Sequence, residues 1–377
     1  MKNSNSLLKG EWRSMKRILC CLTVCMLLLV LYPAMPTQAE ESAVQTVEVG
    51  IPVEEHPELF LTRSMPTHGE GKIAVFLIEF PDYPNENPVA TQEYYDKLYF
   101  SGGLETSWEN TTVAEFYREQ SYGKLNLSGQ VFDWYTAKHE RSYYDHRKAE
   151  LIMEAAEYYQ NQGVDFSQFD GDGDGILDAI AFHFSGDCSV ETDDPWYSGV
   201  CYTQPYGFGT IDGLRFQKIV QVYEGANKEL NNIISIVCHE LMHTLGMPDL
   251  YGERWHPLVA VNDLMSKNEP MINPYTKMLL GWQETVQVIT SDTENIRLDL
   301  YGTSENGKAV IVTDEYKGLF DEFYMVAFRM HGLTVWHIDA RLNENGTAFA
   351  YQNLYYVPRP DQNTDDEAYI SRYLFIE

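Results

Sequence analysis

The pattern of apolar and polar positions predicts a chain that mixes strands with helices. Strands are predicted where apolar residues run consecutively or alternate, and helices where they recur every three or four positions. The predicted strands cover residues 72–80, 124–132, 179–184, 218–223, 309–313, 323–328 and 333–337, and the predicted helices cover 112–118, 146–160 and 229–245. Because most strands precede the long helix and others follow it, the order favours an α+β fold.

The helix predicted at 229–245 has the broadest apolar face in the chain. Its apolar residues recur at helical spacing and are Leu230, Ile233, Ile234, Val237, Leu241, Met242 and Leu245. This range contains no proline or glycine, and Pro248 follows soon after it. Such a pattern is typical of a helix that lies against a core on one side.

The second half of this helix carries the motif HELMHTLGMPDLY, which begins at His239. His239 and His243 are four residues apart, so both imidazoles project from one helix face and can bind a single zinc ion. Glu240 lies between them, where it can activate a zinc-bound water as the general base. Gly246 can end the helix, which lets Asp249 turn back as a third ligand. This is the arrangement of a zinc peptidase.

Other interpretations of the same residues stay open at this point. The histidines could belong to a surface helix with accidental spacing, and Asp249 could be a turn residue, with another carboxylate completing the site. The chain could also be a non-catalytic exported metal-binding protein or a surface adhesin. Glu240 argues against a purely structural site, since such a site has no use for a general base beside its ligands.

Several segments also resemble known zinc peptidases. Residues 262–266 (NDLMS) resemble the methionine turn of metzincin-type peptidases. Segments in the same order as in the immune inhibitor A-like family of secreted bacterial zinc peptidases are 75–82, 119–127, 170–178, 273–282 and 332–339. The resemblance implies a metzincin-like catalytic domain with an upper sheet, an active-site helix and a lower irregular lobe. It also implies that Met265 supports the zinc site from below without binding the metal, although an ordinary core methionine is the alternative.

The N-terminal region has the pattern of a secretory signal. Two basic residues precede an apolar run at 18–32, which is shorter than a membrane span, and small residues at 37–39 offer a cleavage site. We predict a signal peptide over 1–39 and a secreted protein without stable membrane association; an uncleaved anchor is the alternative. The polar segment 40–66 is predicted to be an extended leader or propeptide remnant.

The remaining chain is predicted to form two parts. Residues 67–290 would form the peptidase domain, and residues 291–377 a C-terminal β-rich portion packed on it. Removing residues 1–39 takes away five basic residues and one acidic residue, so the formal charge falls from −29 to −33. So negative a protein should repel nucleic acid. The expected partner is a protein or peptide substrate, and the expected state is a monomer.

A second metal site is predicted in the sequence DGDGDGILD, which starts at Asp170. Asp170, Asp172, Asp174 and Asp178 place hard oxygen ligands close together, and the backbone carbonyl of Ile176 would add another, which suits a structural calcium ion. The twelfth position of the loop is alanine, unlike the glutamate of an EF-hand. The alternative is a solvated acidic turn that binds nothing.

Cysteines and isolated histidines add weaker signals. In an exported chain, Cys188 and Cys201 are a plausible disulfide pair, while Cys238 beside the motif is expected to be a buried, inert thiol. His183, and His337 with Asp339, end predicted strands. They could act in catalysis, but a histidine that closes an apolar strand is more often structural.

Overall fold

The computed structural model describes residues 44–346, except 105–107, 109–110, 190, 192, 227–229, 252–262, 269, 292–295, 302–307 and 330–331. The predicted signal peptide and Asn262 therefore lie outside the described residues. Within these residues, no helix is long and apolar enough to cross a membrane.

A five-stranded sheet forms the centre of the part that contains α6 (Leu230–Thr244). Its strands, in spatial order, are β3 (Leu125–Thr136), β2 (Gly69–Glu79), β5 (Ala179–Phe184), β9 (Lys218–Tyr223) and β6 (Val200–Thr203). The first four are parallel, and β6 pairs antiparallel with β9 at the edge. Four predicted strands match β2, β3, β5 and β9, whereas β6 was not predicted, because four half-buried residues carry little periodicity.

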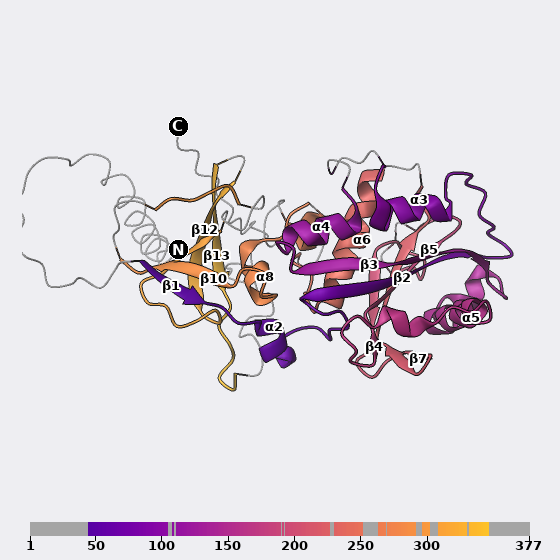
Figure 1. Ribbon diagram of the computed structural model, residues 1–377, viewed down its shortest axis with the longest axis horizontal. Helices are drawn as coiled ribbons and strands as arrows, with labels where there is room; N and C mark the ends of the chain where they lie inside the picture. Colours follow the sequence, from indigo (N-terminus) through magenta and orange to yellow (C-terminus); the bar gives the residue numbers. More distant parts are fainter. Residues whose placement is uncertain are drawn as a thin grey trace, which may run out of the picture.

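Helices cover both faces of this sheet (Figure 1). One face packs against α3 (Gln92–Asp96), α4 (Val113–Gln120) and α6 (Leu230–Thr244), and the other packs against α5 (Lys148–Gln160). The buried strand β2 explains this arrangement, since Ile73, Val75 and Leu77 point to the first core and Ala74 and Phe76 to the second.

A second five-stranded sheet lies at the other end of the molecule (Figure 1). Its order is β1 (Val44–Glu48), β10 (Thr285–Ile289), β11 (Val310–Val312), β12 (Glu322–Arg329) and β13 (Gly332–Asp339). Only β10 and β11 are parallel. A third, small sheet has the order β4 (Ile176–Leu177), β8 (Leu214–Phe216) and β7 (Gly209–Ile211).

Short helices connect these units. They are α2 (Pro52–Glu55), η1 (Pro57–Leu59), η2 (Lys97–Ser101), η3 (Arg141–Tyr144), η4 (Phe166–Phe169), α7 (Leu264–Lys267) and α8 (Pro274–Leu279). The helix predicted over 112–118 is confirmed as α4, and Thr112 caps it, because its hydroxyl accepts a hydrogen bond from the Glu115 backbone at 2.9 Å.

The structure bears on the predicted leader and on the predicted disulfide. Within residues 40–66, predicted as an extended leader or propeptide remnant, the described residues form β1, which pairs along its whole length with β10, and α2. The leader therefore stays a prediction, and its described residues have a defined structure. The correction concerns the cysteines. The disulfide predicted between Cys188 and Cys201 is not formed, since no disulfide joins these two cysteines. The Cys188 thiol instead donates to the carbonyl of Ser189. Cys238 is a buried free thiol, as expected.

Candidate metal centre

Helix α6 holds the predicted zinc-binding motif against the core. Its residues Ile233, Ile234 and Val237 are fully buried on the side that faces the central sheet. The helix ends at Thr244, and Gly246 then takes φ +90°, a left-handed conformation that suits glycine. A Cβ at this glycine would lie 3.1 Å from the Leu61 carbonyl oxygen. The predicted helix stop is therefore confirmed.

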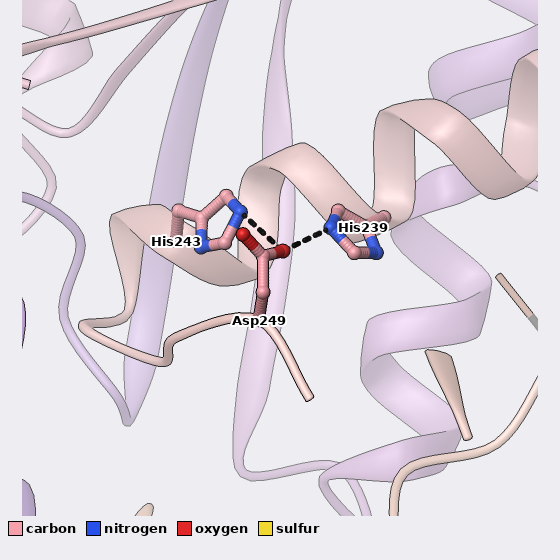
Figure 2. A group of neighbouring side chains, drawn as sticks. All are labelled: His239, His243 and Asp249. Atoms are coloured by element: carbon pink, nitrogen blue, oxygen red, sulfur yellow. Dashed lines mark hydrogen bonds and ion pairs between the residues drawn. The ribbon is translucent and has the colours of Figure 1, made fainter. Parts of the chain in front are cut away.

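The reversal after Gly246 brings the three predicted ligands together (Figure 2). One carboxylate oxygen of Asp249, Oδ1, lies 2.8 Å from His239 Nε2 and 3.4 Å from His243 Nε2. All three potential ligand atoms lie within 4.8 Å of one another. Both imidazoles are buried, while the Asp249 side chain is 38% exposed and leaves one side of the cluster open to solvent.

Backbone carbonyls orient both imidazoles from behind. His239 Nδ1 donates to the carbonyl of Leu264 at 2.9 Å, and His243 Nδ1 donates to the carbonyl of Met247 at 2.7 Å. Because a carbonyl can only accept, the Nδ1 atoms carry the protons and each Nε2 is directed at Asp249. Two imidazole nitrogens, one carboxylate oxygen and an open side fit a tetrahedral zinc ion that keeps a water.

Glu240 is buried directly beside this cluster. Its Oε2 lies 3.8 Å from His243 Nε2. Burial raises the pKa of Glu240, while the neighbouring histidines act in the opposite direction. Burial alone would lower the pKa of His239. The hydrogen bond with Asp249 and the charge of Glu240 outweigh burial and raise this pKa to about 9. Two carboxyl groups therefore favour positive charge between them, which a divalent cation can supply.

Comparison with known proteins decides the family. The profile of the catalytic domain of immune inhibitor A peptidase M6 matches residues 62–263. The chain belongs to this family of metallopeptidases. The pre-pro-metalloprotease PrtV of Vibrio cholerae serotype O1, from strain M66-2 and from strain ATCC 39315 (El Tor Inaba N16961), is 24% identical over 232 residues. The match takes in 49% of this chain and a quarter of the length of these relatives.

Two further residues contact either a ligand or the residue next to one. Met265, in α7, is buried, and its carbonyl accepts a hydrogen bond from the Leu250 backbone at 2.8 Å. Tyr251 was not singled out from the sequence. Its ring stacks on the His239 ring with centroids 6.1 Å apart. Its position two residues after Asp249 was the available signal, but spacing alone does not show which way a loop side chain points.

The acidic loop brings three of its aspartates together. Ligand oxygens of Asp170, Asp172 and Asp174 lie within 4.8 Å of one another. Asp170 accepts hydrogen bonds from the backbone of Gly173, Asp174 and Gly175 at 2.7, 3.1 and 3.0 Å. Most of the hydrogen bonds that hold these three carboxylates in place therefore come from within the loop.

Asp178 and Ile176 have different surroundings. The Asp178 carboxylate is fully buried and accepts hydrogen bonds from the backbone of Lys72 at 2.8 Å and of Gly171 at 3.2 Å. Burial raises its pKa to about 8. Ile176 forms β4 and pairs with Arg215. Asp178 therefore joins the loop to the central strand β2, and it is not part of the group of three.

The isolated histidines have ordinary structural contacts. His183 is fully buried, with Nδ1 3.2 Å from the Tyr223 carbonyl and Nε2 3.0 Å from the Tyr99 hydroxyl. His337 Nε2 lies 3.0 Å from a Glu322 carboxylate oxygen, and Asp339 pairs with Arg341. Neither histidine belongs to either group of converging ligand atoms found in the described parts of the chain.

Proposed function

We propose that this protein is a secreted zinc endopeptidase, with zinc held by His239, His243 and Asp249 and with Glu240 as the general base. One observation carries the proposal. Two imidazole nitrogens and a carboxylate oxygen converge within 4.8 Å, while the opposite nitrogen of each imidazole is occupied by a backbone carbonyl. The membership of a metallopeptidase family supports the same chemistry.

Glu240 would move the proton during peptide hydrolysis. A bound zinc would polarise the scissile carbonyl and lower the pKa of its water. Glu240 would take a proton from that water and later deliver it to the amine of the leaving peptide. Burial raises the pKa of Glu240, which brings it closer to neutral pH, where a proton shuttle works best. The open side at Asp249 gives a peptide access to the cluster.

Two further parts of the proposal rest on the sequence and on the loop geometry. Asp170, Asp172 and Asp174 would bind a structural calcium ion, with Asp178 and the Ile176 carbonyl near the same loop. The apolar run at 18–32 and its flanks support export through a cleaved signal peptide. The substrate would be an exposed peptide segment of another protein.

The test compares the purified protein with Glu240→Gln, using digestion of an unfolded protein substrate and measurement of bound zinc. We expect the variant to keep zinc and to lose a factor of about 10² to 10⁴ in kcat. Gln keeps the size of the side chain but cannot accept the proton. Wild-type protein that holds zinc but cleaves nothing would favour a non-catalytic binding protein, and protein without zinc would reject the ligand set.

A further inference from the structure

We infer that Asp263 is a positioning residue for the metal centre, because its buried carboxylate fixes the turn whose carbonyls orient His239 and the segment that carries Asp249. This inference rests on the proposed function and adds a residue that touches neither the substrate nor the metal. The turn comprises residues 263–268 and includes α7.

Two consecutive carbonyls of this turn accept hydrogen bonds, one from His239 and one from the residue after Asp249. The Leu264 carbonyl accepts the proton of His239 Nδ1 at 2.9 Å. The Met265 carbonyl accepts the backbone N–H of Leu250, the residue after Asp249, at 2.8 Å. The first and third predicted ligands are therefore both oriented by one short segment. Groups that orient metal ligands in this way typically change metal affinity when they are altered.

The Asp263 carboxylate holds this segment through three hydrogen bonds. Its Oδ1 accepts the backbone N–H of Met265 at 2.8 Å. Its Oδ2 accepts both the backbone N–H and the Nδ2–H of Asn273, at 2.8 and 2.9 Å. The side chain is buried, so each of these bonds is made without competition from water. One carboxylate thus joins the turn to a residue ten positions later.

Asn273 in turn is fixed to a buried helix. It is the N-cap of α8, where its Oδ1 accepts the backbone N–H of Thr276 at 2.9 Å and its Nδ2 contacts the Thr276 hydroxyl at 2.9 Å. Every residue of α8 is buried. The turn 263–268 is therefore anchored to the buried helix α8 through Asp263. A displacement of this turn would carry the Leu264 carbonyl away from His239.

The contacts explain why a carboxylate is needed at this position. Its two oxygens face three N–H groups, so both must accept. In Asp263→Asn one oxygen becomes an NH₂ group, which would point at an N–H of Met265 or Asn273. Two donors would then face each other in a buried site, and the turn would have to shift.

The experiment measures zinc affinity by competition with a chelator in the purified protein and in Asp263→Asn. We expect the variant to bind zinc about 10- to 100-fold more weakly. We also expect the visible absorption of the cobalt-substituted protein to change, since the ligand geometry changes. The matched control is Asp165→Ala, which removes another N-cap carboxylate, at η4, whose residues pack in the core on the other side of the central sheet. It should lower the melting temperature but leave zinc affinity and the cobalt spectrum unchanged.

A second variant keeps the test decisive if Asp263→Asn does not fold. Asn273→Ser retains an N-cap for α8 and removes the Nδ2 group that bonds Asp263 and the Thr276 hydroxyl, so it should weaken zinc binding by several-fold. Unchanged zinc affinity and an unchanged cobalt spectrum in a folded variant would overturn the inference and leave the proposed function intact. Wild-type protein that binds no zinc in the same titration would overturn both.

Discussion

The two clusters of potential metal ligands differ in where their hydrogen-bond partners come from. At His239 and His243, the Nδ1 atoms face away from the cluster and donate to backbone carbonyls. The carbonyl that accepts from His239 belongs to Leu264, which lies 25 positions further along the chain. In the acidic loop, the carboxylate of Asp170 accepts N–H groups of residues three to five positions later. The first cluster is held by the fold, and the second by its own loop.

This difference determines what each cluster can do. The buried imidazoles and Asp249 are fixed with their ligand atoms directed at one another, so a metal ion finds a prepared site. The acidic loop is more exposed, and its backbone N–H groups already neutralise part of the carboxylate charge. A cation there would act on the stability of the loop, while a cation at the histidines would act on chemistry.

The largest expected effects separate the two clusters directly. His243→Ala removes a nitrogen ligand, so bound zinc should fall to near zero and peptide hydrolysis should be lost. Asp172→Asn should keep zinc and activity. It should instead abolish the calcium-dependent rise in melting temperature, which we expect in the wild type to be about 5–10 °C at a hundredfold excess over the dissociation constant.

Zinc content, hydrolysis rate and melting temperature with and without calcium are measured for both variants. His56→Ala, at an exposed histidine outside the cluster, serves as the control for histidine loss. If Asp172→Asn lost activity as completely as His243→Ala, the two clusters would act as one unit. If calcium did not raise the wild-type melting temperature, the loop would be a solvated acidic turn.

Two glycines, one beside Glu240 and one in the acidic loop, give the next test of how the two clusters differ. Gly199 and Gly173 have similar backbone conformations, with φ +84° and +76°. A Cβ at Gly199 would lie 3.1 Å from Ile236 Cγ2 and 3.3 Å from Glu240 Oε1, whereas a Cβ at Gly173 would meet nothing within 4 Å. Both alanine variants should lose about 1–2 kcal/mol of stability from the left-handed backbone. Only Gly199→Ala should also displace Glu240, and we expect its kcat to fall by about tenfold to a hundredfold.

Denaturant unfolding and steady-state kinetics on the two variants separate backbone strain from displacement of the carboxylate. The Gly173→Ala protein is the matched control, since it carries the strain without the contact. Equal kcat values in the two variants would mean that the approach of Gly199 to Glu240 has no bearing on catalysis.

Local patterns were sufficient to predict the elements that carry the chemistry. The apolar spacing in 229–245 predicts α6 to within one residue at each end, and the helix predicted from residue 112 matches the start of α4. Both features arise from residues three or four positions apart, which are neighbours on the surface of a helix. The meeting of His239, His243 and Asp249 also follows from a single turn of chain.

The features that the sequence did not reveal depend on residues far apart in the chain. Strand β1 pairs with β10, more than two hundred residues later, and neither has a long apolar pattern. The role of Asp263 depends on the carbonyl of Leu264, and a carbonyl has no sequence signature. The wrong disulfide prediction has the same origin, since spacing along the chain does not show which way two thiols point.

The smallest expected effect concerns the electrostatic cost of burying Lys277 in α8, the helix to which the turn 263–268 is anchored. Lys277, in α8, is fully buried, with Nζ 4.4 Å from the centre of the Tyr122 ring and 5.0 Å from that of Tyr301. Burial lowers its pKa to about 7. In the unfolded chain its pKa would be about 10.4, so between these values the unfolded state binds more protons and stability should rise with pH.

Lys277→Met should remove this rise and raise the melting temperature near pH 7, because it removes a buried charge. The measurement is the difference between variant and wild type from pH 7 to pH 10, because other groups also titrate in this range. Lys317→Met, at an exposed lysine, should show no such difference. A Lys277→Met profile parallel to that of the wild type would mean that the two tyrosine rings solvate the ammonium as well as water does. Burial of Lys277 in α8 would then impose no electrostatic cost.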